Sequence, residues 1–159
     1  MSMQKEDAFN ATKVMSAMWG GFFKDVSNEI GNAKAVALYA RQGETFGDML
    51  AGMLRAQAAD KGLSIDILAS VLSAAPAVFG MTPEVEETAT SLKLHTHRCP
   101  IYDGCKEAGW DHDAIGSVCR ALAACEYAAL TKAFPQVSAR LEFRSAPDKA
   151  CVEEYSLAK

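Results

Sequence analysis

Two histidines and a cysteine stand at alternate positions in the segment KLHTHRCP, in the second half of the chain. Side chains along a β-strand point alternately to its two faces, so this spacing predicts that His95, His97 and Cys99 share one face. An imidazole beside a thiol stabilises the thiolate, which is the nucleophilic form of cysteine, and the same groups can bind a metal ion. The alternative is a polar, solvated strand face that ends in a small buried cysteine.

Two more cysteines fall in a segment with the pattern of a long helix. The spacing of Cys119 and Cys125 places them about 240° apart around a helix axis, and therefore on different sides of it. Cys119 instead shares a face with Glu126. Free cysteine is often a core residue, so packing in the core is the alternative for each thiol.

The last cysteine, Cys151, opens the final predicted strand, where alternation places it on one face with Glu153 and Tyr155. If the C-terminal hairpin lies beside the KLHTHRCP strand, Cys151 can approach Cys99. Thiols from two distant segments would then meet in one site.

Two sets of charged residues could also bind a ligand. Arg140 and Arg144 share a predicted strand face with Glu142, and a solvated face is the first interpretation. If that face lines a pocket, arginine suits a carboxylate ligand because its guanidinium binds two oxygens at once. The segment DHD at 111–113 resembles an acidic metal cluster, but it also fits a helix start, where acidic residues complement the helix dipole.

Composition and charge exclude several classes of protein. The 159 residues are 50% hydrophobic and 23% charged, a balance typical of one globular domain. A net charge of −4 offers no basic face to nucleic acid, and no apolar run is long enough to span a bilayer. The five cysteines, an odd number without an export signal, predict a cytoplasmic protein.

Hydrophobic residues at helical spacing predict that the first half of the chain is helical. One helix runs from Met3 to Glu29, and the pair Gly20-Gly21 within it predicts a kink or a close contact with the backbone. A second runs from Ala33 to Ala59, with Gly43 as a candidate break. A third begins at Ser64.

The second half mixes strands and helices. Strands are predicted at 84–99, 137–145 and 151–157, and helices at 101–108 and 111–134. The predicted fold class is α+β. A single domain of residues 1–159 has a helical part (1–82) followed by strand–helix–helix–β-hairpin (83–159), with a small antiparallel sheet packed on the helices.

The stretch that begins RCPIYDGCKEAGWDHDAIGSVCRALAACEYAAL and ends at Leu157 carries a resemblance to a known family. It is similar to the family named for L-2-amino-thiazoline-4-carboxylic acid hydrolase, and more distantly to small-molecule-binding domains related to 4-vinyl reductases. The residues that carry the resemblance are a cysteine after a strand (Cys99), a helix ending at Gly109, a helical cysteine (Cys119), Pro135 before a strand that contains Arg140, and Asp148 shortly before Cys151.

The resemblance implies a cysteine-dependent hydrolase that acts on a small, polar, cyclic molecule containing sulfur or nitrogen. Cys99 or Cys119 would be the nucleophile. His97 or His95 would be its base, and Arg140 would anchor a substrate carboxylate. The candidate catalytic residues are Cys99, Cys119, His97 and Cys151, and the candidate substrate-binding residues are His95, Arg140 and Glu126.

Two other functions are kept open. A non-catalytic binding or sensor domain is favoured by the Met- and Phe-rich helical part, and by Leu122 and Ala123, which stand where the family's pattern has an acidic residue. A metal site built from His95, His97 and cysteines could bind zinc or iron. In each case we expect a small-molecule or ion partner, neither nucleic acid nor a membrane, and a homodimer is left open.

Overall fold

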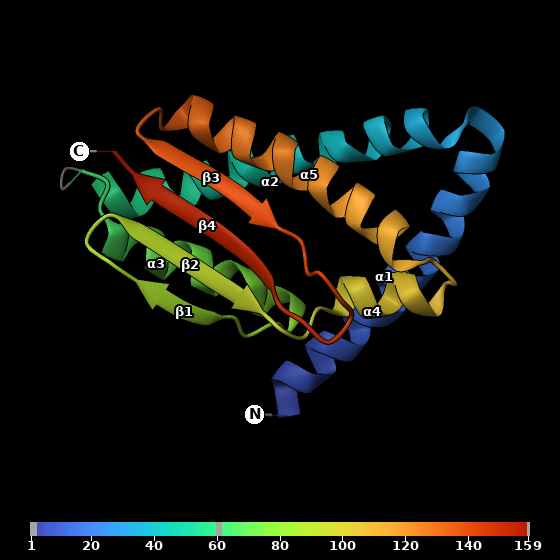
Figure 1. The fold of residues 1–159 in the computed structure, drawn as a ribbon. Helices are drawn as coiled ribbons and strands as arrows, with labels where there is room; N and C mark the ends of the chain where they lie inside the picture. The colour runs from blue at the N-terminus through green and yellow to red at the C-terminus, as the bar shows by residue number, and fades with distance from the viewer. Residues whose placement is uncertain (1–2, 60–61, 159) are drawn as a thin grey trace.

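The computed structural model describes residues 3–59 and 62–158, and its first half is helical (Figure 1). Two long helices form, as the helical spacing predicts, and Ser64 caps a third by accepting a hydrogen bond from the Ile67 amide at 3.3 Å. These elements are α1 (Met3–Ile30), α2 (Asn32–Ala58), α3 (Ile65–Ala74) and the short 3₁₀ helix η2 (Ala75–Phe79).

The second half supplies a four-stranded antiparallel sheet with the strand order β1-β2-β4-β3. In Figure 1 the sheet lies at one end of the molecule, and α1 with α4 lies at the other. The fold is α+β, with a helical first half followed by strands and helices, as predicted. The elements are β1 (Glu84–Glu87), β2 (Ser91–Thr96), α4 (Pro100–Glu107), α5 (His112–Ala133), β3 (Val137–Glu142) and β4 (Cys151–Leu157).

The single strand predicted at 84–99 is wrong, because the segment folds into a hairpin of β1 and β2. The Oγ1 of Thr88 accepts a hydrogen bond from the Ser91 amide at 3.0 Å and so fixes the turn. Threonine favours strands, but its hydroxyl can also form hydrogen bonds with the nearby backbone. Here this local hydrogen bond forms a turn in place of a continuous strand. β2 then ends at Thr96, and Cys99 becomes the N-cap of α4.

Two glycines set the distance between α2 and α5. A Cβ atom at Gly43 would overlap the carbonyl oxygen of Leu122, and one at Gly47 would overlap that of Glu126. The break considered at Gly43 does not occur, because this glycine lies inside a continuous helix and lets the α5 backbone approach. In α1, Gly20 likewise marks a close contact, with Ala108, and not a helix end.

The core consists of two clusters. One joins α2, α3 and α5 to the inner face of the sheet, and the other joins α1, α4 and the first turns of α5. The first includes the fully buried Leu54, Leu92 and Leu130, and the second includes Phe23 and Trp110. Among the helices that the structure describes, none is long and apolar enough to cross a membrane.

We predict that Gly47→Ala lowers the free energy of unfolding by more than about 2 kcal/mol, since overpacking a tight contact forces the backbone to shift. Gly52→Ala is the matched control on the same helix, because nothing lies within 4 Å of its Cβ position. It should stabilise the protein by up to about 1 kcal/mol through helix propensity. Urea denaturation measures both changes, and equal effects would contradict the proposed role of Gly47.

Candidate functional site

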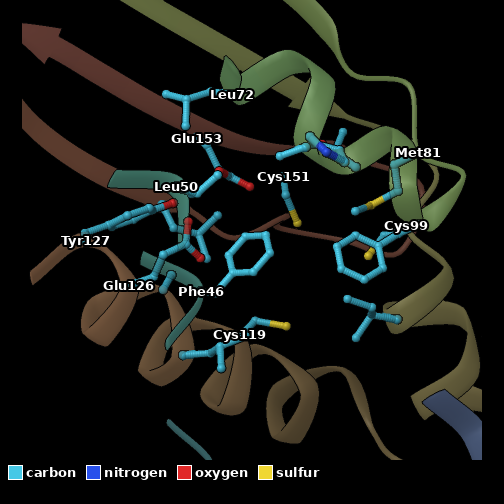
Figure 2. A pocket seen from close by; sticks show the side chains of 18 of the residues that line it. Phe46, Leu50, Leu72, Met81, Cys99, Cys119, Glu126, Tyr127, Cys151 and Glu153 are labelled. Carbon is cyan, nitrogen blue, oxygen red and sulfur yellow. The ribbon is translucent and has the colours of Figure 1, made fainter. Parts of the chain in front are cut away.

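A cavity of about 360 Å³ lies where the two core clusters meet, with α2 and α5 along one wall and the inner face of the sheet along another (Figure 2). Its lining is mainly apolar, which is typical of small-molecule sites. The polar groups are therefore few, and they are the ones that decide what the cavity can do. They are Tyr39, Gln42, Thr96, Cys99, Cys119, Glu126, Tyr127, Cys151, Glu153 and Tyr155.

A second hollow, of about 480 Å³, is larger but lies open on the surface. It is lined by four charged residues, and two of these, Lys13 and Glu107, already form an ion pair of 2.7 Å. An open, solvated depression of this kind holds a ligand less well than an enclosed apolar cavity. The mainly apolar cavity, which is only partly open to solvent, is therefore the candidate site.

Three of the predicted thiols, Cys99, Cys119 and Cys151, line this cavity. They come from the N-cap of α4, from the middle of α5 and from the start of β4. Figure 2 shows their sulfur atoms pointing toward the same part of the cavity. Cys151 pairs with Thr96 of β2, so β4 does lie beside the strand that leads to Cys99, as the sequence analysis considered.

Two carboxyl groups also line the cavity, and Figure 2 shows that of Glu126 across the Phe46 ring from Cys99. Glu126 comes from α5, on the helix face it was predicted to share with Cys119. Glu153 comes from β4, and its Oε2 accepts a hydrogen bond of 2.6 Å from the Tyr155 hydroxyl. Glu153 was not among the predicted site residues, although strand alternation already placed it on one face with Cys151.

Burial controls the protonation of these carboxyl groups. It raises the pKa of Glu126 to about 8, and the charge of Glu153 adds to this effect. Burial also raises the pKa of Glu153, which the hydrogen bond from Tyr155 partly opposes. At neutral pH, Glu126 is therefore mostly a neutral acid that can donate a proton.

The thiols of Cys99 and Cys119 are protonated for the same reason. Burial raises the pKa of Cys99 to about 11 and raises that of Cys119 further. The positive charge of Arg144 acts in the opposite direction on both, but it is weaker than burial. Neither thiol is a ready nucleophile at neutral pH.

Arg144 is buried, with 3% of its surface exposed, although the sequence analysis placed it on a solvated face. That interpretation is wrong because β3 ends at Glu142, and the chain beyond it turns inward. The guanidinium carbon lies 4.5 Å from the centre of the Tyr102 ring. Its nitrogens donate hydrogen bonds to Cys151 Sγ (3.4 Å) and to the carbonyl oxygens of Pro147 (3.2 Å), Thr96 (3.1 Å) and His97 (3.2 Å).

No carboxylate pairs with Arg144 within the described ranges. A buried charge normally has such a partner, and here carbonyl dipoles, an aromatic ring and a sulfur atom take its place. The hydrogen bond from its Nε gives Cys151 a charged donor. Cys151 thus differs chemically from the other two thiols.

The two strand histidines do not line the cavity. They lie on the opposite face of the sheet, where His95 Nε2 is 3.3 Å from Glu86 Oε1 and His97 Nε2 is 3.5 Å from Glu84 Oε2. The predicted face shared by both histidines and Cys99 is wrong, because the strand ends at Thr96 before it reaches the cysteine.

Arg140, the predicted anchor for a carboxylate, also lies on that outer face. Its Nε donates to Glu154 Oε2 at 2.8 Å, and its side chain is 73% exposed. At 111–113, Asp111 caps α5 by accepting a hydrogen bond of 2.7 Å from the Ala114 amide, which confirms a helix start. In the part of the chain that the structure describes, no three His, Cys, Asp or Glu side chains converge on a metal position.

Comparison with protein-family models and with curated proteins gives no match for this chain. The resemblance to the hydrolase family therefore stays a prediction carried by the residues quoted for it. The functional argument rests on the cavity and its polar groups.

We predict that Glu126→Gln removes a pH dependence of stability. Between pH 4.5 and about 8 the folded wild-type protein keeps a proton that the unfolded chain has lost, so its free energy of unfolding falls as the pH rises. The free energy of unfolding of the variant should equal that of the wild type near pH 5. At pH 9 it should be higher by a few kcal/mol, since one pKa unit corresponds to about 1.4 kcal/mol.

Urea denaturation at a series of pH values measures this difference. Glu142→Gln is the matched control, because Glu142 is exposed on β3 and should leave the wild-type pH dependence intact. A Glu126→Gln variant that is no more stable than wild type at pH 9 would show that the carboxyl is not held protonated.

Proposed function

We propose that this protein binds a small cyclic molecule in the cavity and hydrolyses a C–N bond in it, as a protein of the L-2-amino-thiazoline-4-carboxylic acid hydrolase type. The observation that carries the proposal is the convergence of Cys99, Cys119 and Cys151 on one cavity. These residues are far apart in the sequence, and each also belongs to the pattern on which the family resemblance rests. Two carboxyl groups in the same cavity add acid–base capacity.

Cys151 is the best candidate for the nucleophile. It receives a hydrogen bond from the buried guanidinium of Arg144, whereas burial keeps Cys99 and Cys119 protonated. Arg144 would stabilise the thiolate in place of a histidine base, since neither strand histidine lines the cavity. The proposal therefore moves the nucleophile from Cys99 or Cys119 to Cys151.

The chemistry can be written for an amidine C–N bond. The Cys151 thiolate adds to the amidine carbon, and the leaving nitrogen takes a proton from the neutral acid Glu126 and departs as an amine. A thioimidate on Cys151 remains. Water attacks its carbon, one proton of the water goes to the thioimidate nitrogen, and the other restores Glu126. The C–S bond then breaks, and its electron pair returns to sulfur. The net change is the hydrolysis of an amidine to an amide and an amine.

A non-catalytic binding or sensor domain is the second candidate. Specific observations favour it, namely the mainly apolar lining and the high pKa of Cys99, which burial raises to about 11. Both candidates need a ligand in the same cavity. They differ only in whether the ligand is changed.

We predict that Cys151→Ser abolishes turnover of cyclic amidines, with a loss of at least about 100-fold, because an alcohol beside Arg144 is a far weaker nucleophile than a thiolate. Binding of the same compounds should change little. Thermal unfolding measures binding, and mass spectrometry of the products measures turnover. Cys125→Ser is the matched control, since Cys125 is a free thiol on α5 that does not line the cavity.

The outcomes separate the two candidates. Stabilisation of the wild type by cyclic amidines without any product supports the binding domain and contradicts the hydrolase. Full turnover by Cys151→Ser excludes Cys151 as the nucleophile. If none of the cyclic amidines tested binds or reacts, the cavity is not a site for this class of molecule.

A further inference from the structure

We infer that the ligand of this cavity consists of one apolar ring and a nitrogen-containing head group that donates hydrogen bonds. This head group is an amidinium or an amine, and the ligand is not an acid. This inference rests on the proposed binding function and specifies the chemical class of the ligand. It keeps the cyclic amidine of the proposed function but departs from the carboxylate of the substrate for which the resembled family is named, and from the expectation that Arg140 anchors such a carboxylate.

The first observation is the charge on the cavity wall. In the lining that the structure describes, Glu126 and Glu153 are the only charged residues, and no Lys, Arg or His belongs to it. Arg140 lies on the other face of the sheet, paired with Glu154. Arg144 borders the thiol end, but carbonyl oxygens and a sulfur atom occupy four of its five N–H donors.

The second observation is that the carboxyl groups have unused acceptor capacity. Among the residues that the structure describes, none hydrogen-bonds the Glu126 carboxyl, which lines the cavity. Glu153 accepts one hydrogen bond, at Oε2 from the Tyr155 hydroxyl. Neither carboxyl is among the fully buried atoms that lack a partner in the described residues, so a ligand that donates N–H groups to this pair would replace water there and gain hydrogen bonds in a mainly apolar cavity.

The third observation concerns the rest of the cavity. Phe46, Leu50 and Leu72 form apolar walls beside the carboxyl pair, and the volume of about 360 Å³ suits a single ring with a small head group. Aromatic rings also attract a cation electrostatically, and Phe46 lies between the two ends of the cavity. Above about pH 8, where Glu126 loses its proton, a carboxylate ligand would instead meet a negative charge in a mainly apolar cavity, where like charges repel strongly.

Three compounds that share one ring and differ only in the head group test this inference. These are benzamidine, a cation with N–H donors; benzamide, a neutral donor; and benzoate, an anion. Isothermal calorimetry should show benzamidine binding at least about tenfold more tightly than benzamide, and benzoate binding least. Glu126→Gln and Glu153→Gln should each reduce the preference for benzamidine over benzamide.

Glu154→Gln is the matched control, because Glu154 is the neighbour of Glu153 on β4 but contacts Arg140 on the outer face. It should leave the preference intact. A second readout is pH, since a cation is bound best by an ionised carboxylate. Benzamidine affinity should rise from pH 6.5 to 8.5 in the wild type and rise less in Glu126→Gln. The titratable groups that interact with Glu126 are Glu153 and Tyr155 from β4 and Tyr127 from α5.

Each result bears on a different claim. Benzoate binding as tightly as benzamidine would overturn the ligand class and leave the binding function standing. An equal loss of preference in Glu154→Gln would show that surface charge, and not the cavity pair, selects the cation. If none of the three compounds binds, the proposed binding function itself fails. Thermal unfolding of each variant checks that the fold is retained.

Discussion

The contact between the backbones of α2 and α5 is the constraint on which the site depends. Gly43 and Gly47 let α5 approach more closely than any side chain would allow, at the carbonyl groups of Leu122 and Glu126. This contact fixes the position of the α5 face that lines the cavity and holds that face opposite the sheet. Protein interiors yield little to added volume, so a larger residue at either glycine would displace the cavity wall itself.

The cavity has two chemically different ends, and its polarity follows from which charges are buried nearby. At one end Arg144 sits among carbonyl oxygens, against Cys151. At the other end Glu126 and Glu153 share a poorly solvated region, and burial raises the pKa of both. Phe46 lies between these ends. A ligand that spans the cavity would therefore meet a thiol hydrogen-bonded to a guanidinium at one point and a buried acid at another, which is the arrangement that the proposed hydrolysis needs.

Local patterns predicted the parts of the site that lie within one element. The helical repeat placed Cys119 and Glu126 on one face, and strand alternation placed Cys151 with Glu153. The same alternation failed for Cys99, because the strand stops at Thr96 and the chain then starts a helix. The other error in this segment is the missed turn at Thr88, which divides the predicted strand into β1 and β2. A turn formed by a threonine hydroxyl depends on a local hydrogen bond that β-propensity does not reveal.

The sequence by itself determined the helices, the antiparallel hairpin and the α+β class, because these depend on periodicity and on capping residues close in the chain. Only the tertiary structure decided that three thiols meet, that His95 and His97 face away from them, and that Arg144 is buried. The physical reason is that strand order and helix packing set contacts between distant segments. Whether a charged side chain is solvated or enclosed depends on those contacts and not on its neighbours in sequence.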